Sequence, residues 1–390
     1  MPVRLLHTSD WHVGKKIRGH SRIEEHREAL NEIVAIAESE QVDLVIVAGD
    51  LFESAAPTPD AEQLVWETLL ALATGSRHVV VIAGNHDNAR KLDALAPVFA
   101  KAGVVIVAEP TRPDEGGVVE LAINDQIVRL ALLPFVSQRS IVRATELMAN
   151  AAFEHAQHYS ARMASLIETL CASFDAESIN IIAAHGFLHG GGPGGGERAA
   201  HLIEEYAVSA QLFPATAHYV ALGHLHRAQK IAGGTALHYS GSPLQLDFGE
   251  GGEVKSVNVV ELAVGKPAKV DRHTLKTGRP LRTVSGSLSE LRTLQLTDDP
   301  WLRVRVQEAS RVGLADDVRD ALGEGVVDVT VVSNADVEVT PPRRDLNERS
   351  HREVFQLYLD EQGVADERLI TLFDDLTEEL QEVDRDEATT

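Results

Sequence analysis

The sequence is poor in the residues and segments that mark secreted and membrane-spanning proteins. Its 390 residues include one cysteine, Cys171, so no disulfide can form within the chain, as is typical of a reducing compartment. No apolar run is long enough to span a bilayer, and the first residues turn polar too soon for a signal peptide. These absences predict a cytoplasmic protein that has no contact with a membrane.

Basic residues are also scarce, because 36 Lys and Arg stand against 59 Asp and Glu and give a net charge of −23. A chain this acidic is not expected to coat DNA through a broad basic face, since that mode of binding depends on lysine and arginine. The chain can still meet phosphate through bound metal ions, whose charge dominates their surroundings. The acidity therefore excludes one mode of nucleic-acid binding and leaves a metal-dependent one open.

What is present is enough apolar material for one large core, since 44% of the residues are hydrophobic. The first third alternates buried strands with amphipathic helices, a β-α-β-α-β order that predicts a parallel sheet. The strands are expected at residues 3–7, 43–48 and 78–83, and the helices at 22–40 and 60–73.

The middle of the chain is richer in strand patterns. A hairpin is expected across Asn124-Asp125, followed by a helical region at about 138–171. Further short buried strands are expected at residues 178–184, 218–222, 237–240 and 254–262. We therefore expect an α/β fold in which two sheets pack together with helices outside, a four-layer α/β/β/α sandwich rather than one doubly wound sheet.

A change in composition near residues 276–280 predicts that a first domain, 1–278, ends there. Strands at 302–306 and 326–332 with a helix at 314–322 predict a small α+β domain over 279–340, which Pro341-Pro342 ends. Residues 341–390 form an acidic C-terminal segment with a pair of amphipathic helices, at 347–362 and 366–382. An isolated helix pair buries little, so these helices are expected to pack on the main body or to bind a partner.

Five short polar motifs each follow one of the predicted strands. They are Asp10-Trp11-His12, Gly49-Asp50, Gly84-Asn85-His86-Asp87, His185-Gly186 and Gly223-His224-Leu225-His226. Ligands of α/β sheets collect at the carboxyl ends of strands, so the five ends can converge on one point. Glycine before Asp50, Asn85 and His224 is expected to let the backbone turn tightly there.

Seven side chains of these motifs have the chemistry of a dinuclear metal site: Asp10, His12, Asp50, Asn85, His185, His224 and His226. Carboxylate and amide oxygens mixed with imidazole suit Mn²⁺, Fe²⁺ or Zn²⁺, and the lack of cysteine ligands argues against structural zinc. One carboxylate bridging two ions keeps them roughly 3.5–4 Å apart, the spacing for in-line phosphoryl displacement. A lone Asp-X-His or Gly-Asp is usually a surface turn, so the prediction depends on all five motifs together.

A glycine-rich stretch at residues 185–199 begins at one of these ligands, His185. Its low complexity is typical of a flexible surface loop. Its position also favours a flap beside the metal site, and the two interpretations are compatible.

The motifs resemble those of the calcineurin-like metallophosphoesterase superfamily and, within it, the SbcD family of nuclease subunits of double-strand-break repair complexes. The likeness covers residues 1 to about 275. It rests on residues 7–14 (HTSDWHVG), Asp50-Leu51-Phe52, 84–87 (GNHD), 239–243 (YSGSP) and 248–250 (FGE).

The resemblance implies that one ion is held by Asp10, His12, Asp50 and His226, and the other by Asp50, Asn85, His185 and His224. Asp50 would be the bridge. His86 would be the catalytic residue outside the coordination sphere, stabilising the transition state or protonating the leaving oxygen with the aid of Asp87. Archaeal relatives carry histidine where this chain has Glu53, so the substrate-positioning role of that histidine is not carried over, and no residue is assigned to substrate binding.

The resemblance further implies a Mn²⁺-dependent exonuclease on double-stranded DNA and endonuclease on single strands and hairpins, acting in DNA repair and recombination. Residues 279–340 would cap the DNA, residues 341–390 would bind the coiled coil of an SbcC-like ATPase, and the nuclease domain would form a homodimer.

Two alternatives remain. A phosphoesterase acting on small phosphodiesters or phosphoproteins has the same metal chemistry but no need of the region beyond residue 280. A non-catalytic scaffold predicts a damaged ligand set, whereas every ligand position and His86 are filled.

Overall fold

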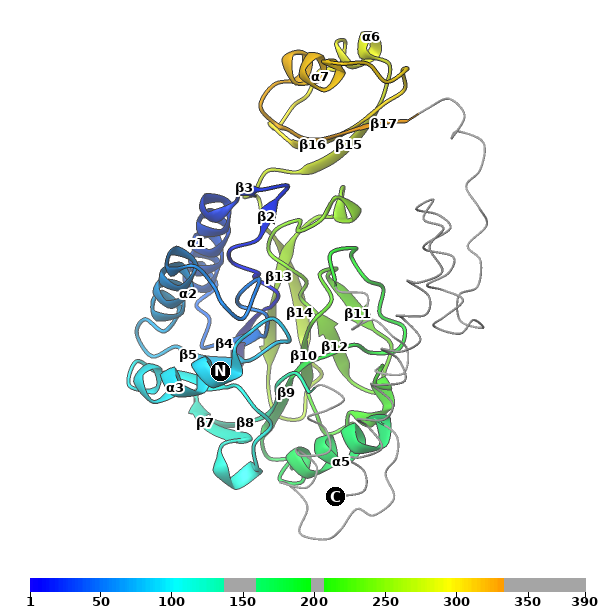
Figure 1. Cartoon of the computed structure of the whole chain (residues 1–390). Helices are drawn as coiled ribbons and strands as arrows, with labels where there is room; N and C mark the ends of the chain where they lie inside the picture. The colour runs from blue at the N-terminus through cyan, green and yellow to red at the C-terminus, as the bar shows by residue number, and fades with distance from the viewer. Residues whose placement is uncertain (137–158, 198–206, 333–390) are drawn as a thin grey trace, which may run out of the picture. The chain divides into compact units, whose positions relative to one another are not determined.

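A computed structural model of the chain describes residues 1–136, 159–197 and 207–332 (Figure 1). The helices expected in residues 341–390, and the first part of the helical region expected at 138–171, lie outside the described residues. Among the helices of the described ranges, none combines the length and apolar character needed to cross a membrane.

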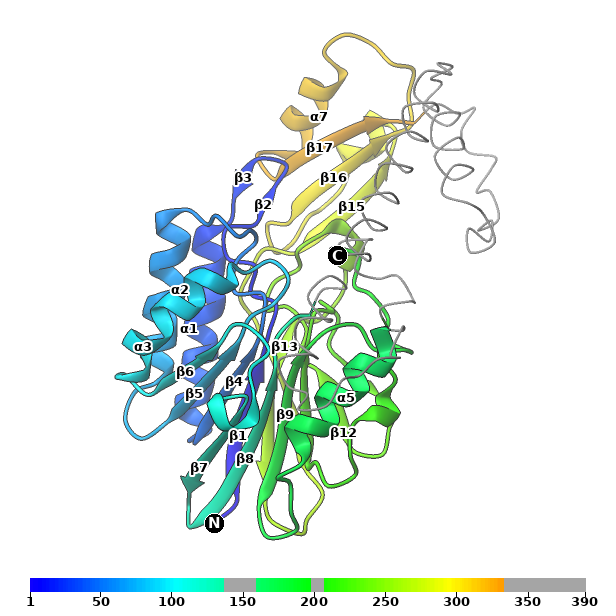
Figure 2. The ribbon, with the colours of Figure 1, turned by 60° about the horizontal axis from the view of Figure 1, so that its bottom comes forward.

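The first sheet has six strands in the order β14-β13-β1-β4-β5-β6. Its parallel part is β1 (Val3–Thr8), β4 (Leu44–Ala48), β5 (His78–Ile82) and β6 (Val104–Val107), and antiparallel partners at one edge are β13 (Ser256–Leu262) and β14 (Lys269–Thr274). Helices α1 (Ile23–Ser39), α2 (Pro59–Leu72) and α3 (Ala89–Ala100) cover its outer face (Figure 2). Sequence reasoning missed α3, in which Pro97 interrupts the helical pattern, and the edge strands β6 and β14.

The second sheet has the order β11-β12-β10-β9-β8-β7, and α5 (Tyr159–Cys171) packs on its outer face. Its strands are β7 (Val118–Ile123), β8 (Gln126–Leu133), β9 (Ile179–His185), β10 (Tyr219–Gly223), β11 (Gln229–Ile231) and β12 (Ala236–Tyr239). The hairpin β7–β8 turns at Asn124 and Asp125, with φ of 50° and 60°. Positive φ at both turn residues matches the right-handed twist of the strands, which explains the asparagine and aspartate there.

The inner faces of the two sheets form one core. Leu5, Ile46 and Ile82 of the first sheet belong to the same buried cluster as Leu132 and Ile181 of the second. The expected four-layer α/β/β/α sandwich is therefore confirmed. Strands β1, β4 and β5 are parallel in the first sheet, and β9 and β10 are parallel in the second. Side chains that follow strands of both sheets come together, so these carboxyl ends share one rim of the molecule.

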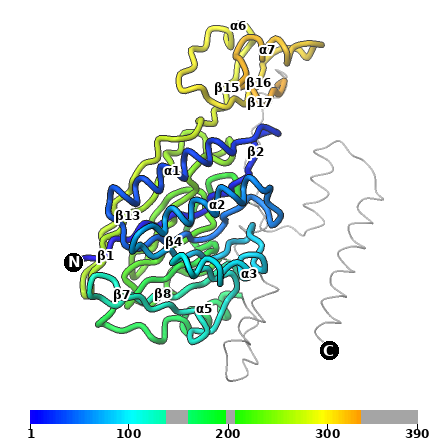
Figure 3. Tube along the Cα trace, turned by 90° about the vertical axis from the view of Figure 1, so that its left-hand side faces the viewer, coloured from blue at the N-terminus to red at the C-terminus, as the bar shows by residue number. Residues whose placement is uncertain are grey.

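A small sheet follows the sandwich in sequence (Figure 3). Strands β15 (Leu281–Gly286), β16 (Trp301–Val306) and β17 (Val326–Val331) are parallel, and α6 (Leu288–Leu291) and α7 (Leu314–Leu322) cover them around a separate core. The strand-helix-strand pattern expected here is present, with β15 and α6 in addition. The short hairpin β2 (Lys16–Ile17) and β3 (His20–Ser21), which was also not expected, contacts this unit through His20 and Trp301.

A buried carboxylate joins the small sheet to α1. Glu25 accepts hydrogen bonds from Arg22, from the Trp301 indole at 2.9 Å and from the Arg279 backbone amide at 2.9 Å. Burial by itself would raise the pKa of Glu25, but Arg22 and the other donors lower it. The ionised form is therefore the one the folded protein stabilises.

Replacing Glu25 by glutamine is expected to lower the free energy of unfolding by about 3 kcal/mol at pH 7, because Arg22 stays buried without its charge partner. Since the pKa of Glu25 is depressed in the folded state, its contribution is complete above the pKa of the unfolded state and is lost as the pH falls through the folded value. Urea unfolding of wild type and variant at pH 7 measures the loss of free energy, and the same experiment below pH 4 shows whether the difference disappears. Glu24→Gln, at an exposed neighbour, is the control, and an equal effect from it would contradict the assignment.

Candidate metal centre

The seven predicted ligands lie together at the carboxyl ends of β1, β4, β5, β9 and β10. Six of them are buried, with at most 4% of the residue exposed: Asp10, His12, Asp50, His185, His224 and His226. Asn85 is half-buried. Side chains from five distant segments thus share one enclosed rim, as the five motifs predict.

Ligand atoms from these residues fall into overlapping groups, within each of which all atoms lie within 4.8 Å of one another. One group is Asp10, His12 and His226, and another is Asp10, Asp50 and His185. The carboxylate of Asp50 belongs to the second group and also reaches the first, because its Oδ2 is 3.5 Å from Nε2 of both His12 and His185. This is the place that a bridging ligand needs.

The amide of Asn85 joins the remaining histidine, His224, to the second group. Its Oδ1 lies 3.1 Å from His185 Nε2 and 2.9 Å from His224 Nδ1. Each of the seven predicted ligands therefore has at least one other of them as a close neighbour at this rim.

The backbone is strained where it presents these ligands. Asp10, His12, Asp50 and His224 have φ of 53°, 46°, 53° and 106°, in the region that residues other than glycine rarely adopt. The loops after β1 and β4 hold each other in this state, because Asp10 N donates to the Gly49 carbonyl and His12 N to the Asp50 carbonyl. Strain of this kind persists where function requires it.

The glycines that precede three ligands serve two different purposes. Gly49 has a φ of +93°, so the expected tight turn is present there. At the other two glycines the reason is close approach: a Cβ on Gly84 would lie 2.1 Å from Asp50 Oδ1, and one on Gly223 would lie 1.9 Å from the Ala48 carbonyl oxygen. Any side chain at Gly223 would push the two sheets apart at the site.

The histidine ring of His12 fits a metal ligand. Its Nδ1 lies 3.1 Å from Glu53 Oε2, while its buried Nε2 has no hydrogen-bond partner in the described residues and faces Asp50. A buried nitrogen without a partner is costly unless a cation or proton satisfies it. The arrangement matches a carboxylate-backed imidazole that directs its lone pair at a metal ion.

The electrostatics of the rim favour positive charge. Burial would lower the pKa of His185, but the charges of Asp50 and Asp10 raise it to about 9. Burial would raise the pKa of Asp50, but His185 and His12 hold it well below its usual value. The buried carboxylate oxygens and imidazole nitrogens that meet here are the donors that divalent cations such as Mn²⁺ take, so the residues fit a dinuclear metal site.

His86 lies against this site without belonging to either set of predicted ligands. Its backbone N donates to Asp50 Oδ1 at 2.8 Å, its Nδ1 lies 2.6 Å from the Glu53 carbonyl oxygen, and its ring centre is 4.6 Å from that of His12. His86, His12 and Asp50 also form one of the groups with metal-ligand spacing. The geometry therefore places His86 where it can act either as a metal ligand or as a residue beside the metal site.

Asp87 is tied to the backbone of two loops. Its carboxylate accepts hydrogen bonds from the amides of Gly84, Leu51 and Phe52. Burial and the charge of Asp50 raise the pKa of Asp87 to about 6. These contacts fix the loops that carry Asn85 and Asp50, and the aid of Asp87 to His86 stays a prediction.

Three carboxylates around the site were not predicted from the sequence. Glu53 pairs with His12 and Lys15, which lower its pKa to about 2 although burial would raise it. Glu250 contacts the ring of His226, and Glu197 contacts its backbone. Glu250 stood within the FGE stretch of the resemblance, but no motif in the sequence signals Glu53 or Glu197.

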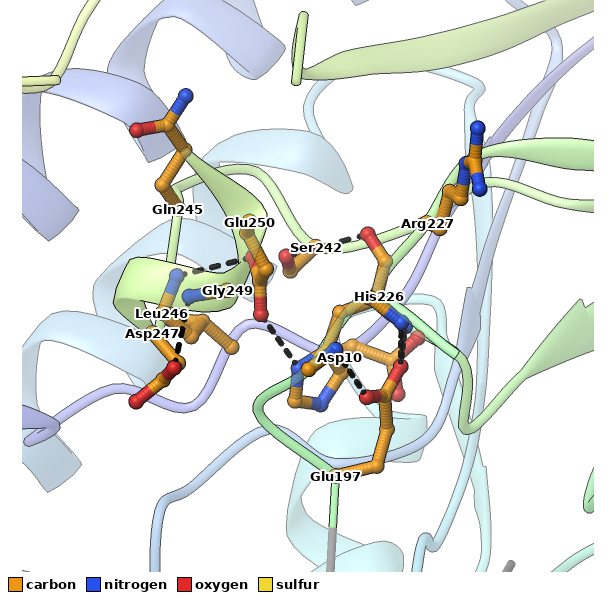
Figure 4. Close-up of polar contacts among 12 residues, drawn as sticks. Asp10, Glu197, His226, Arg227, Ser242, Gln245, Leu246, Asp247, Gly249 and Glu250 are labelled. Carbon is orange, nitrogen blue, oxygen red and sulfur yellow. Dashed lines mark hydrogen bonds and ion pairs between the residues drawn. The ribbon is translucent and has the colours of Figure 1, made fainter. Parts of the chain in front are cut away.

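The glycine-rich stretch makes defined contacts over its described part, residues 186–197. Leu188 forms a bridge with Val208, and the amide and carbonyl of Gly192 pair with the side chain of Gln229. Glu197 then closes the loop onto His226 (Figure 4). The expected position beside the site is confirmed, and the contacts show what holds the loop there.

Comparisons with known proteins agree with this geometry. The family described as calcineurin-like phosphoesterase matches residues 3–228, and the type 5 capsule protein repressor C-terminal domain matches residues 277–363. The chain is 32% identical to the SbcD subunit of nuclease SbcCD from Bacillus subtilis (strain 168), over 98% of this chain and 100% of that protein. The chain belongs to the SbcD family of calcineurin-like phosphoesterases.

Other SbcD relatives match over a shorter span. Identity is 32% to the SbcD subunit of nuclease SbcCD from Escherichia coli (strain K12), over 75% of this chain and 73% of that protein. The identity to the SbcD subunit of nuclease SbcCD from Rhodobacter capsulatus is 34%, over 67% of this chain and 67% of that protein. The SbcD resemblance inferred from the motifs is therefore confirmed.

Proposed function

We propose that this chain is the nuclease subunit of an SbcCD-type complex and cuts DNA with two Mn²⁺ ions. It degrades double-stranded ends and cleaves single strands and hairpins in repair and recombination. The observation that carries the proposal is the convergence of seven buried or half-buried side chains, Asp50 and six others around it. The relatives named as SbcD subunits of nuclease SbcCD support the substrate and the complex.

In this proposal Asp10, His12, Asp50 and His226 hold the first ion, and Asp50, Asn85, His185 and His224 hold the second. Bound there, two such ions lower the pKa of a water molecule and neutralise phosphate oxygens. The mixture of oxygen and imidazole donors suits Mn²⁺. His86 is 8% exposed, so solvent can reach it. Its proposed role is to stabilise the transition state or to give a proton to the leaving oxygen.

The remaining parts take the roles that the family suggests. Residues 1–278 form the nuclease domain, residues 279–340 cap the DNA, and residues 341–390 bind the coiled coil of an SbcC-like ATPase. The net charge of −23 supports a partner that supplies much of the DNA-binding surface. We further propose a homodimer formed through the nuclease domain and a cytoplasmic location.

The direct test is to incubate the purified chain and Mn²⁺ with linear duplex DNA and with hairpin DNA, with and without the ATPase partner. We expect both substrates to be cut. Intact DNA in every combination would contradict the proposal. Cleavage of a small phosphodiester alone would instead favour a phosphoesterase of small substrates.

Replacing His86 by alanine is expected to lower kcat by about 10²- to 10⁴-fold, the usual contribution of a general acid, while two ions still bind. Single-turnover cleavage and calorimetric Mn²⁺ titration measure the two effects separately. His189→Ala, an exposed histidine of the glycine-rich loop, is the control. Loss of one ion in the His86 variant would make His86 a ligand, and unchanged turnover would remove it from the mechanism.

A further inference from the structure

The ring of His226 is oriented by a buried carboxylate. Its Nδ1 lies 3.0 Å from Glu250 Oε1. Because a carboxylate only accepts, Nδ1 must carry the hydrogen of this bond. In the neutral ring the other nitrogen, Nε2, then keeps its lone pair, so Nε2 is the atom that can serve as a ligand where His226 groups with Asp10 and His12.

Glu250 has no freedom to turn away from that ring. It is 0% exposed, and its second oxygen accepts from Lys255 Nζ at 2.6 Å and from the Leu246 amide at 3.0 Å. It ends the short helix η5 (Phe248–Glu250), whose first turn is capped by Asp247. Both carboxylate oxygens are therefore engaged by particular donors.

The backbone of His226 is fixed as well. Its N donates to Glu197 Oε1 at 2.9 Å, and its carbonyl oxygen accepts from Lys255 Nζ at 3.0 Å. Figure 4 shows His226 between Glu250 on one side and Glu197 on the other. The residue is thus held at its ring, its amide and its carbonyl by three buried or half-buried charged side chains.

We propose that Glu250 is a positioning residue, which holds His226 in the Nδ1–H tautomer with Nε2 directed at the first metal ion. This inference rests on the dinuclear site proposed above. The competing explanation is that Glu250 only balances the charge of Lys255. Glu253 separates the two, because it also pairs with Lys255, at 3.2 Å, while its described contacts do not include the His226 ring.

Replacing Glu250 by glutamine keeps the shape and removes the charge. Three donors face this side chain: the His226 ring, the Leu246 amide and Lys255 Nζ. An amide has one oxygen that accepts and one NH₂ group that donates, so at least one of these donors would face the NH₂ group. The ring of His226 then loses its single orientation. Loss of such an outer partner typically lowers metal affinity by about 10- to 100-fold. We expect that loss for the first ion, and an unchanged second ion.

The experiment titrates the full-length, metal-free chain with Mn²⁺ by calorimetry, comparing wild type, Glu250→Gln and Glu253→Gln. We expect two ions in all three and one weakened ion in Glu250→Gln alone. Equal affinities in Glu250→Gln and wild type overturn the inference, as does the same loss in Glu253→Gln. A wild type that binds fewer than two ions contradicts the proposed dinuclear site instead.

A second measurement uses the wild-type chain alone, so its result does not depend on whether a variant folds. In the Zn²⁺-loaded wild type with ¹⁵N-labelled histidine, nuclear magnetic resonance reports which ring nitrogen carries the proton. We expect His226 to carry it on Nδ1, shifted downfield by the hydrogen bond to Glu250. A proton on Nε2 overturns the inference even if Glu250→Gln is insoluble.

Discussion

Replacing Asp50 by asparagine is expected to abolish binding of both ions and to lower DNA cleavage by about 10⁴-fold or more. Two cations together supply several kcal/mol of charge stabilisation in phosphoryl transfer, and each 1.4 kcal/mol is about tenfold in rate. Among the residues that the structure describes, Asp50 is the one carboxylate within 3.5 Å of histidines from both proposed ligand sets. An amide in its place retains the shape but has no charge to share between two ions.

The loss must come from the metal site rather than from the fold. Asp43→Asn makes the same change at the start of the same strand, where the carboxylate accepts from the Arg4 amide far from the site. Mn²⁺ titration, cleavage rate and urea unfolding are measured for both variants. Two ions bound by the Asp50 variant would contradict the bridging role, and equal losses in the Asp43 variant would point to damaged folding.

The central strands and the meeting of the seven predicted ligand side chains could be predicted because each depends on a local pattern. A short apolar run rich in β-branched residues, such as residues 44–48, is typical of a buried strand when helices flank it, and a polar motif at its end is then expected at the rim of the sheet. The predicted strand became Leu44–Ala48, with Asp50 two residues beyond it. Sequence order and strand ends together were enough to bring the seven ligands to one place.

The side chains that hold the ligands could not be predicted, because their partners are set by tertiary packing alone. Glu53 and Glu250 have no distinctive spacing to the histidines they contact, and Glu197 stands at the end of a run that is typical of a plain loop. The reason for Gly223 could not be predicted either. Nothing in Gly-His-X-His shows that the carbonyl of Ala48, from the other sheet, will pass beside it.

Replacing Gly223 by alanine is expected to lower the free energy of unfolding by about 3 kcal/mol or more, at the upper end of overpacking effects. The new Cβ would lie 1.9 Å from the Ala48 carbonyl oxygen and 2.8 Å from His185 Nδ1. A backbone carbonyl in a buried central strand has little room to move. Strand β10 must therefore shift away from β4, and the two histidines that follow β10 shift with it.

Those two histidines, His224 and His226, belong to different ions in the proposed site, so Mn²⁺ affinity should fall at both positions together with stability. Gly186→Ala is the matched control, because a Cβ there meets nothing within 4 Å although the residue directly follows a proposed ligand. Urea unfolding and Mn²⁺ titration of the two variants decide the matter. If Gly223→Ala unfolds at the same urea concentration as Gly186→Ala, the two sheets are not held in backbone contact at the metal centre, and the seven ligands owe their convergence to something else.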